Sequence, residues 1–199
     1  MALAFIVWAS VILLALFEIF LLISLGEHIY SVRFRHQYPP VSCRNAHGRA
    51  IADEITKHYP NAKSAVDIGA GYGRLARAMA HVRGLKVIAI ENMRFSVFVM
   101  RVLNFIFGAR RITVVCADAF EYILHSKKKF DIGVAYLGPA MNARLKELTK
   151  KFHVIITLDV EIPGLKPTRV IDVPGGGHTH YHYVGKFPHR LFVYEFTKI

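Results

Sequence analysis

The sequence is poor in cysteine and in acidic residues. Only Cys43 and Cys116 occur among the 199 residues, so no disulfide framework is predicted and a reducing compartment is favoured. No internal repeat or low-complexity tract is visible, which excludes solenoid and fibrous architectures. Acidic side chains number 14 against 26 Lys and Arg, for a formal net charge of +12. This excess indicates an anionic partner, either a lipid surface or a nucleic acid.

Charge is almost absent from the N-terminal segment. Between Ala2 and Leu25 the one ionisable residue is Glu18. At about 1.5 Å per residue, a helix over this segment is long enough to cross a hydrocarbon core of about 30 Å. No Lys or Arg precedes Arg33, so the basic region of a cleavable signal peptide is missing. We therefore expect a single transmembrane helix that stays attached to the chain.

Basic residues follow the apolar segment. Because positive charge accumulates on the cytoplasmic side of a span, we expect the rest of the chain in the cytoplasm, or in the matrix if the membrane is the mitochondrial inner membrane. The predicted organisation is an anchor over 1–27, a juxtamembrane segment with a leading helix over 28–60, and one domain over 61–199. The basic and titratable residues concerned are His28, Arg33, Arg35, His36 and Arg44.

Residues 64–77 read SAVDIGAGYGRLAR, the pattern of a buried strand, a tight turn and a helix. Glycine at such a turn takes backbone angles that other residues avoid and lets a ligand approach the main chain. A dinucleotide fingerprint, G-x-G-x-x-G, would need glycine where this chain has Arg74. The pattern here is G-x-G-x-G, which predicts a nucleotide-type cofactor and departs from the dinucleotide fingerprint. The loop glycines are Gly69, Gly71 and Gly73.

Acidic residues end or follow the next two apolar runs. Lys86 to Ile90 reads as a second buried strand and leads directly into Glu91. A carboxylate at that position can accept hydrogen bonds from both hydroxyls of a ribose. A third run, Ile112 to Cys116, is followed by Asp118. Alone, either acid would be read as a helix cap or a solvated turn residue, whereas together they favour a nucleoside site.

With these residues in order, the chain resembles the class I S-adenosylmethionine (SAM)-dependent methyltransferases. The resemblance implies an α/β fold: a Rossmann-like, seven-stranded sheet with helices on both faces, preceded here by the transmembrane helix. It implies SAM as cofactor, with Glu91 at the ribose and Asp118 and Phe120 at the adenine. It assigns the methionine end of SAM to Asp67, Gly69, Gly71 and Gly73.

The fourth apolar run, Phe130 to Tyr136, ends in Leu-Gly-Pro. In the methyltransferase pattern this place faces the reacting methyl group. The resemblance therefore makes Tyr136 and Pro139 the candidate catalytic residues, lining the acceptor channel. Tyr136 is equally well explained as a core tyrosine at a strand end.

The whole chain is also similar to the membrane-tethered seven-strand protein-lysine methyltransferases. This group includes the enzymes for the mitochondrial ATP synthase c subunit and the adenine nucleotide translocase, with prokaryotic relatives. The shared features are the apolar N-terminus, the Tyr38-Pro39 element, Arg74 after the glycine loop, and the segments GPAM and VIITLDVEIPGLKPTRV. Tyr72 and Leu165 depart from the family pattern, replacing an acidic and an aromatic residue respectively. The resemblance implies N-methylation of a lysine in a membrane protein.

Two other function classes stay open. The first is a methyltransferase for a small molecule or a lipid headgroup, and the second is a non-catalytic membrane scaffold that keeps the fold. Nucleic acid is the less favoured partner, because the fourth strand ends in YLGPA rather than in the Asn- or Asp-Pro-Pro-aromatic sequence of base methyltransferases. The anionic lipid surface is the favoured reading of the positive charge.

The segment 174–189 carries a glycine-rich stretch and several histidines. His178, His180 and His182 alternate, so on an extended strand they would share one side and could hold a metal. We expect a solvent- or headgroup-facing loop instead, and no metal site is predicted. The remaining elements expected are helices over 45–58, 74–82, 94–107 and 140–151, a fifth strand over 152–158, and a strand pair over 168–173 and 191–197.

Overall fold

The computed structural model describes residues 2–34, 43, 45–173 and 189–196. The chain divides into two compact units, 1–39 and 40–199. The first contains α1 (Ala2–Phe34). Within α1, the 20 residues Ala4–Ile23 have a mean hydropathy of 2.7, long and apolar enough to cross a membrane by length and composition. The predicted apolar helix is confirmed, and it continues beyond the expected anchor to Phe34.

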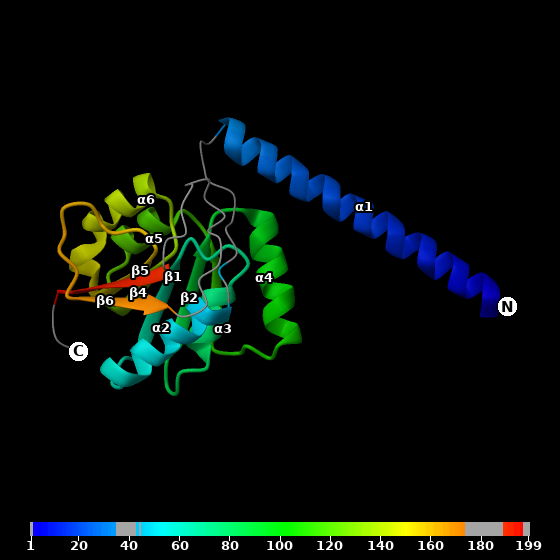
Figure 1. The fold of residues 1–199 in the computed structure, drawn as a ribbon. Coiled ribbons are helices and arrows are strands. Elements are labelled where there is room, and N and C mark those ends of the chain that lie inside the picture. The colour runs from blue at the N-terminus through cyan, green and yellow to red at the C-terminus, as the bar shows by residue number, and fades with distance from the viewer. Residues whose placement is uncertain (1, 35–42, 44, 174–188, 197–199) are drawn as a thin grey trace. The chain divides into compact units, whose positions relative to one another are not determined.

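The second unit is built on a seven-stranded sheet with the order β3-β2-β1-β4-β5-β7-β6 (Figure 1). The strands β3, β2, β1, β4 and β5 run parallel, and β7 pairs antiparallel with both β5 and β6. This confirms the predicted Rossmann-like methyltransferase sheet. The strands are β1 (Ser64–Ile68), β2 (Lys86–Glu91), β3 (Ile112–Cys116), β4 (Phe130–Ala135), β5 (Phe152–Leu158), β6 (Arg169–Val173) and β7 (His189–Glu195).

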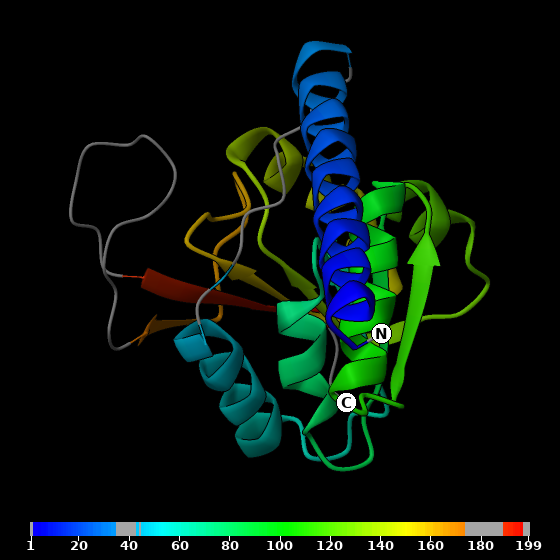
Figure 2. The same ribbon diagram turned by 90° about the vertical axis from the view of Figure 1, so that its right-hand side faces the viewer.

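Most residues of the central strands are apolar, because helices cover both faces of the sheet. One apolar cluster joins α2, α3 and Met100 of α4 to one face, and a second joins α5 and η1 to the other. Figure 2 gives the side view of these layers. The helices are α2 (Asn45–His58), α3 (Arg74–Ala80), α4 (Arg94–Ile106), α5 (Ala119–His125), α6 (Pro139–Arg144) and the 3₁₀ helix η1 (Leu145–Lys151).

The register aligns the carboxyl ends of the parallel strands. Ile68 at the end of β1 pairs with Ile90 of β2 on one side and with Ala135 of β4 on the other. The loops that follow these strands therefore emerge at one edge of the sheet, where open α/β sheets bind their ligands.

The structure differs from expectation after β4 and after β3. The helix expected over 140–151 is α6 followed by the 3₁₀ helix η1. Leu145 and Leu148 are both fully buried, and a spacing of three residues places them on one side of a 3₁₀ helix. Helix α5 was not predicted at all. It is one of the shorter helices, and its sequence signal is the cap at Asp118.

Candidate functional site

The glycine loop connects β1 to α3 in left-handed backbone conformations. The φ angles are 73° at Gly69, 53° at Gly71 and 74° at Gly73, a region that side chains with a Cβ disfavour. The loop is also tightly packed, since a Cβ on Gly69 would lie 2.8 Å from Cδ2 of Leu137. The N–H groups of Gly69 and Ala70 donate to the carbonyl of Ile90 at 3.0 and 2.9 Å, which fixes the loop to β2.

Glu91 lies at the end of β2 and holds the loop through its carboxylate. Its Oε2 accepts a hydrogen bond from the N–H of Gly71 at 2.8 Å, and its Oε1 accepts one from Met93 at 2.9 Å. The residue is 7 % exposed. A buried carboxylate with backbone donors on both oxygens is rigidly oriented, and a carboxylate oxygen can accept more than one hydrogen bond, as a ribose-binding acid must.

Asp67 is the other buried acid of this edge. Its Oδ2 accepts a hydrogen bond from the N–H of Ala76 in the first turn of α3 at 2.9 Å. Burial raises the pKa of this carboxyl to about 7, with a further increase from the negative charge of Glu91. In this structure Asp67 therefore anchors the helix that follows the glycine loop. Its contact with the methionine end of a cofactor remains a prediction.

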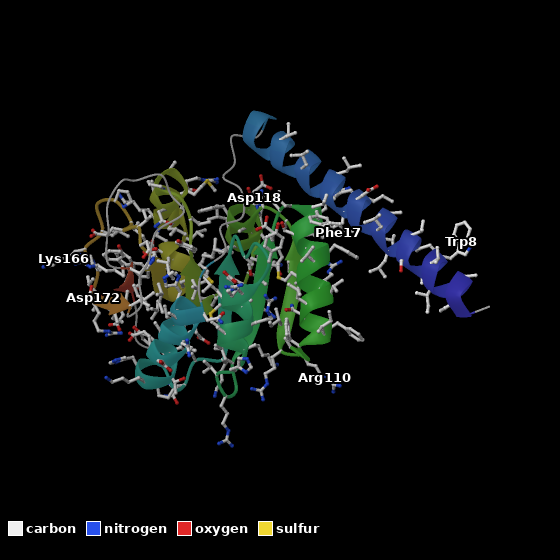
Figure 3. All side chains as sticks on the ribbon, turned by 45° about the vertical axis from the view of Figure 1, so that its right-hand side comes forward. Trp8, Phe17, Arg110, Asp118, Lys166 and Asp172 are labelled. Carbon is white, nitrogen blue, oxygen red and sulfur yellow. The ribbon has the colours of Figure 1, made fainter. Side chains whose placement is uncertain are left out.

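Asp118 and Phe120 begin α5 beside the end of β3. The Oδ1 of Asp118 accepts hydrogen bonds from the N–H groups of Phe120 and Glu121 at 2.9 and 3.0 Å, so Asp118 is the helix N-cap. Figure 3 shows Asp118 and Arg110 at opposite ends of the domain. Phe120 is 2 % exposed, and the guanidinium of Arg144 lies 4.2 Å above its ring. The structure thus packs Phe120 into the core, and adenine contact by these two residues stays a prediction.

The end of β4 adjoins the glycine loop. Leu137 reaches over Gly69, and the neighbouring Tyr136 is half-buried. Pro139 is exposed and occupies the first position of α6, after the extended Gly138. Both predicted catalytic residues therefore lie on the segment beside the loop, as the sequence pattern requires. Their contact with an acceptor stays a prediction.

Cys43 contacts the helix that follows the glycine loop. The Arg74 guanidinium donates to the carbonyl of Cys43 at 2.8 Å, which ties α3 to this residue. Burial raises the pKa of the Cys43 thiol to about 12, so it stays protonated and unreactive at neutral pH. On α2, four residues after Cys43, the ring of His47 lies edge-on to the ring of Tyr136, with ring centroids 6.0 Å apart.

Sequence reasoning missed a second group of polar side chains at this edge. His47, Asp159 and His189 come from α2, the end of β5 and the start of β7, and their donor atoms all lie within 4.8 Å of one another. No local spacing connects positions so far apart, so no sequence signal identifies the group. The alternating His178, His180 and His182 considered in the sequence lie outside the described residues.

Comparison with known proteins supports the fold without naming a family. No protein-family model and no curated protein sequence matches the chain. Among solved structures, an RNA methyltransferase from Salinibacter ruber in complex with S-adenosyl-L-homocysteine aligns with a TM-score of 0.64 and 17% identity, covering 80% of this chain and 95% of that one. A precorrin-6y C5,15-methyltransferase from Geobacter metallireducens aligns with a TM-score of 0.59 and 14% identity, over 81% and 93% of the two chains. The fold is that of the SAM-dependent methyltransferases.

Proposed function

We propose that this protein is a membrane-anchored, SAM-dependent N-methyltransferase. The observation that carries the proposal is Glu91, whose buried carboxylate joins the end of β2 to the glycine loop at Gly71. This is the geometry that a ribose-binding acid needs next to a loop that can accept a cofactor.

In this proposal SAM binds along the carboxyl edge of β1, β2 and β3. The loop Gly69–Gly73 holds the methionine end, Glu91 holds the ribose, and Asp118 and Phe120 lie at the adenine end. The neighbouring S. ruber enzyme was crystallised with S-adenosyl-L-homocysteine, which supports this cofactor by analogy of fold. SAM supplies an already activated methyl group.

Because the methyl group of SAM is already activated, the main task of the protein is to position the acceptor. An uncharged acceptor nitrogen has to lie in line with the methyl carbon while water is excluded. Tyr136 and Pro139, on the segment beside the loop, would line the channel through which the acceptor enters. An ammonium acceptor must first lose its proton, and an apolar pocket favours this loss because burial lowers the pKa of an amine.

Two observations support the membrane part of the proposal. Helix α1 contains the apolar stretch Ala4–Ile23, which is long enough to span a bilayer. Helix α4 presents large apolar side chains to solvent, with Phe105 88 % exposed, while its other face packs on the sheet. Apolar side chains together with arginines on one surface helix are typical of helices that bind at a lipid interface. The exposed apolar residues are Phe98, Val102, Phe105 and Ile106, and the exposed arginines of α4 are Arg94 and Arg101.

The contact of α4 with lipid can be measured directly. In a Trp8→Phe background, Phe105→Trp places an indole on this face, and Tyr122→Trp places one on the exposed surface of α5 as a control. In nanodiscs with brominated acyl chains, we expect strong quenching of the indole on α4 and little quenching of the control. Equal quenching of both would contradict lipid contact by α4.

The proposed acceptor is a lysine of a membrane protein, because an enzyme held at the bilayer reaches such a substrate without a soluble encounter. The test is transfer of a radiolabelled methyl group from SAM to native membranes, separated into protein, lipid and RNA fractions. Label in protein, located on lysine, supports the proposal, and label in lipid supports the headgroup alternative. Glu91→Ala should abolish the signal, whereas Glu121→Ala, an exposed acid on α5, should retain it. No transfer to any fraction would remove the enzyme proposal.

A further inference from the structure

Three side chains from distant parts of the chain meet behind Tyr136. His47 belongs to the first turn of α2, Asp159 follows β5, and His189 begins β7. One nitrogen or oxygen donor atom from each lies within 4.8 Å of the other two. This His-Asp-His cluster is separate from the glycine loop and from Glu91, which form the proposed cofactor site.

The histidines of the cluster are buried and in contact. His47 is 2 % exposed and His189 is 3 % exposed. Their ring centroids are 4.5 Å apart in an edge-on arrangement. Nδ1 of His189 lies 2.7 Å from Oδ2 of Asp159. Two imidazoles and a carboxylate in a water-poor interior form a dense set of metal-ligating groups.

Asp159 is held in an unusual backbone conformation. Its φ of 58° makes it the one non-glycine residue with positive φ in the part of the chain that the structure describes. Its N–H donates to the carbonyl of Arg190 at 2.8 Å, and its Oδ1 accepts from the N–H of Arg190 at 3.0 Å. Such conformations are sparsely populated and persist where the surroundings impose them, often at functional sites. The β5–β7 pairing thus aims the carboxylate at the histidine.

We propose that His47, Asp159 and His189 bind a first-row divalent transition metal of the Zn²⁺ type. Two imidazoles with one carboxylate suit such ions, whereas Mg²⁺ and Ca²⁺ prefer sites made of oxygen ligands. Metal–ligand bonds of about 2.0–2.2 Å need donors about 3–4 Å apart, and the donor atoms of this cluster, all within 4.8 Å of one another, are near that spacing. Three protein ligands leave a coordination position open.

The open position would lie near Tyr136, whose ring is 6.0 Å from that of His47. If the proposed methyltransferase function holds, this position is suited to a water molecule or to a lone pair of the acceptor. Binding of the ion itself does not depend on that function, so the two proposals can fail separately.

The experiment is calorimetric titration of ZnCl₂ into the full-length protein in detergent, purified without a histidine tag and stripped with a chelator. We expect one Zn²⁺ per chain with micromolar or tighter affinity. The variants His47→Gln and His189→Gln should weaken binding by about 100-fold, and Asp159→Asn by about 10-fold. Asparagine tolerates the positive φ, so this variant tests the charge and leaves the backbone conformation accessible. His81→Gln and His125→Gln, at exposed positions, are the matched controls.

Two further measurements keep the result interpretable. Circular dichroism of each variant reports whether the domain is folded, and this readout depends neither on zinc nor on the proposed SAM site. X-ray absorption of the zinc-loaded wild type should show two imidazole ligands together with oxygen, a result that needs no variant. Absence of zinc binding, undiminished binding by the three cluster variants, or a ligand set without two imidazoles would each overturn the proposal.

Discussion

The glycine-loop edge and the His-Asp-His cluster lie in the same domain but arise in different ways. Asp67, the loop Gly69–Gly73 and Glu91 come from one β-α-β unit, and two strands in register bring them together. The cluster takes one residue each from α2, β7 and the segment after β5, near both ends of the domain. The first region is a local motif that tertiary packing supports. The second exists only because β7 inserts beside β5 in the sheet.

The two regions also use their buried acids differently. Asp67 and Glu91 accept hydrogen bonds from backbone N–H groups and so shape the loop. Asp159 accepts from one backbone N–H and directs its other oxygen at a histidine ring. The first arrangement orients a loop, whereas the second orients a side chain. If this contrast is functional, variants in the two regions should affect different ligands.

The largest expected effect is on SAM affinity, which should depend on the glycine-loop edge and not on the His-Asp-His cluster. Glu91→Ala removes the acceptor for two backbone hydrogen bonds and for the ribose, so SAM affinity should fall by about 100-fold. His189→Gln should change SAM affinity by no more than about threefold. Calorimetry with SAM on the detergent-solubilised protein measures both. An equal loss in the two variants would mean that the regions form one site.

The next effect tests the packing of the glycine loop at Gly73. Gly73→Ala places a Cβ 2.5 Å from Cγ of Met100 at a φ of 74°, so it combines backbone strain with overpacking. We expect a loss of about 2–4 kcal/mol in the free energy of unfolding. Gly84→Ala is the matched control, because its φ is 80° but no atom lies within 4 Å of the added Cβ. Its loss should be about 1–2 kcal/mol, from strain alone. Denaturant unfolding compares the two, and equal losses would show that the contact with Met100 relaxes.

A smaller effect concerns the ion pairs that hold α2 to the β6–β7 hairpin, on which the cluster depends. Arg169 lies 2.8 Å from Oε1 of the buried Glu54 and 2.9 Å from Oε1 of Glu195. Arg169→Ala leaves Glu54 buried without this partner and should cost about 2 kcal/mol of unfolding free energy. Arg190 and Asp172 form an exposed pair on the same hairpin, and Asp172 points outward in Figure 3. Asp172→Ala should cost about 0.5 kcal/mol or less of unfolding free energy. A loss as large as that of Arg169→Ala would contradict this expected difference between the two ion pairs.

The last prediction is a change in the pH dependence of stability at the glycine-loop edge. The pKa of Asp67 is about 7 in the folded protein and 3.8 ordinarily, so the folded state binds the proton more tightly than the unfolded state. The stability from this proton is fully present below about pH 4 and is lost as the pH rises through 7. Asp67→Asn should therefore flatten the fall in unfolding temperature between pH 5 and pH 8. An unchanged slope would show that other groups cause it.

Much of the first region could be predicted from residues close in sequence. Buried strands in a parallel sheet are continuous apolar runs, and the expected start at Ser64 and end at Cys116 agree with β1 and β3. Strand β2 starts at the expected Lys86 and ends at Glu91, one residue after the expected Ile90. The apolar helix and the sheet were also predicted. The roles of single side chains were harder. Asp118 caps α5 and Phe120 packs into the core, because a residue type at a strand end does not specify where its side chain points.

Local sequence was enough to predict the order of the strands, the glycine turn after β1 and the apolar helix α1, because each depends on periodicity, backbone freedom or length within a short segment. The short helix α5 was the exception. Tertiary structure alone decided that His47, Asp159 and His189 meet and that Arg169 bridges Glu54 to Glu195. The physical reason is the strand order: β7 pairs between β5 and β6, and α2 packs near them, so groups far apart along the chain become neighbours that no local pattern encodes.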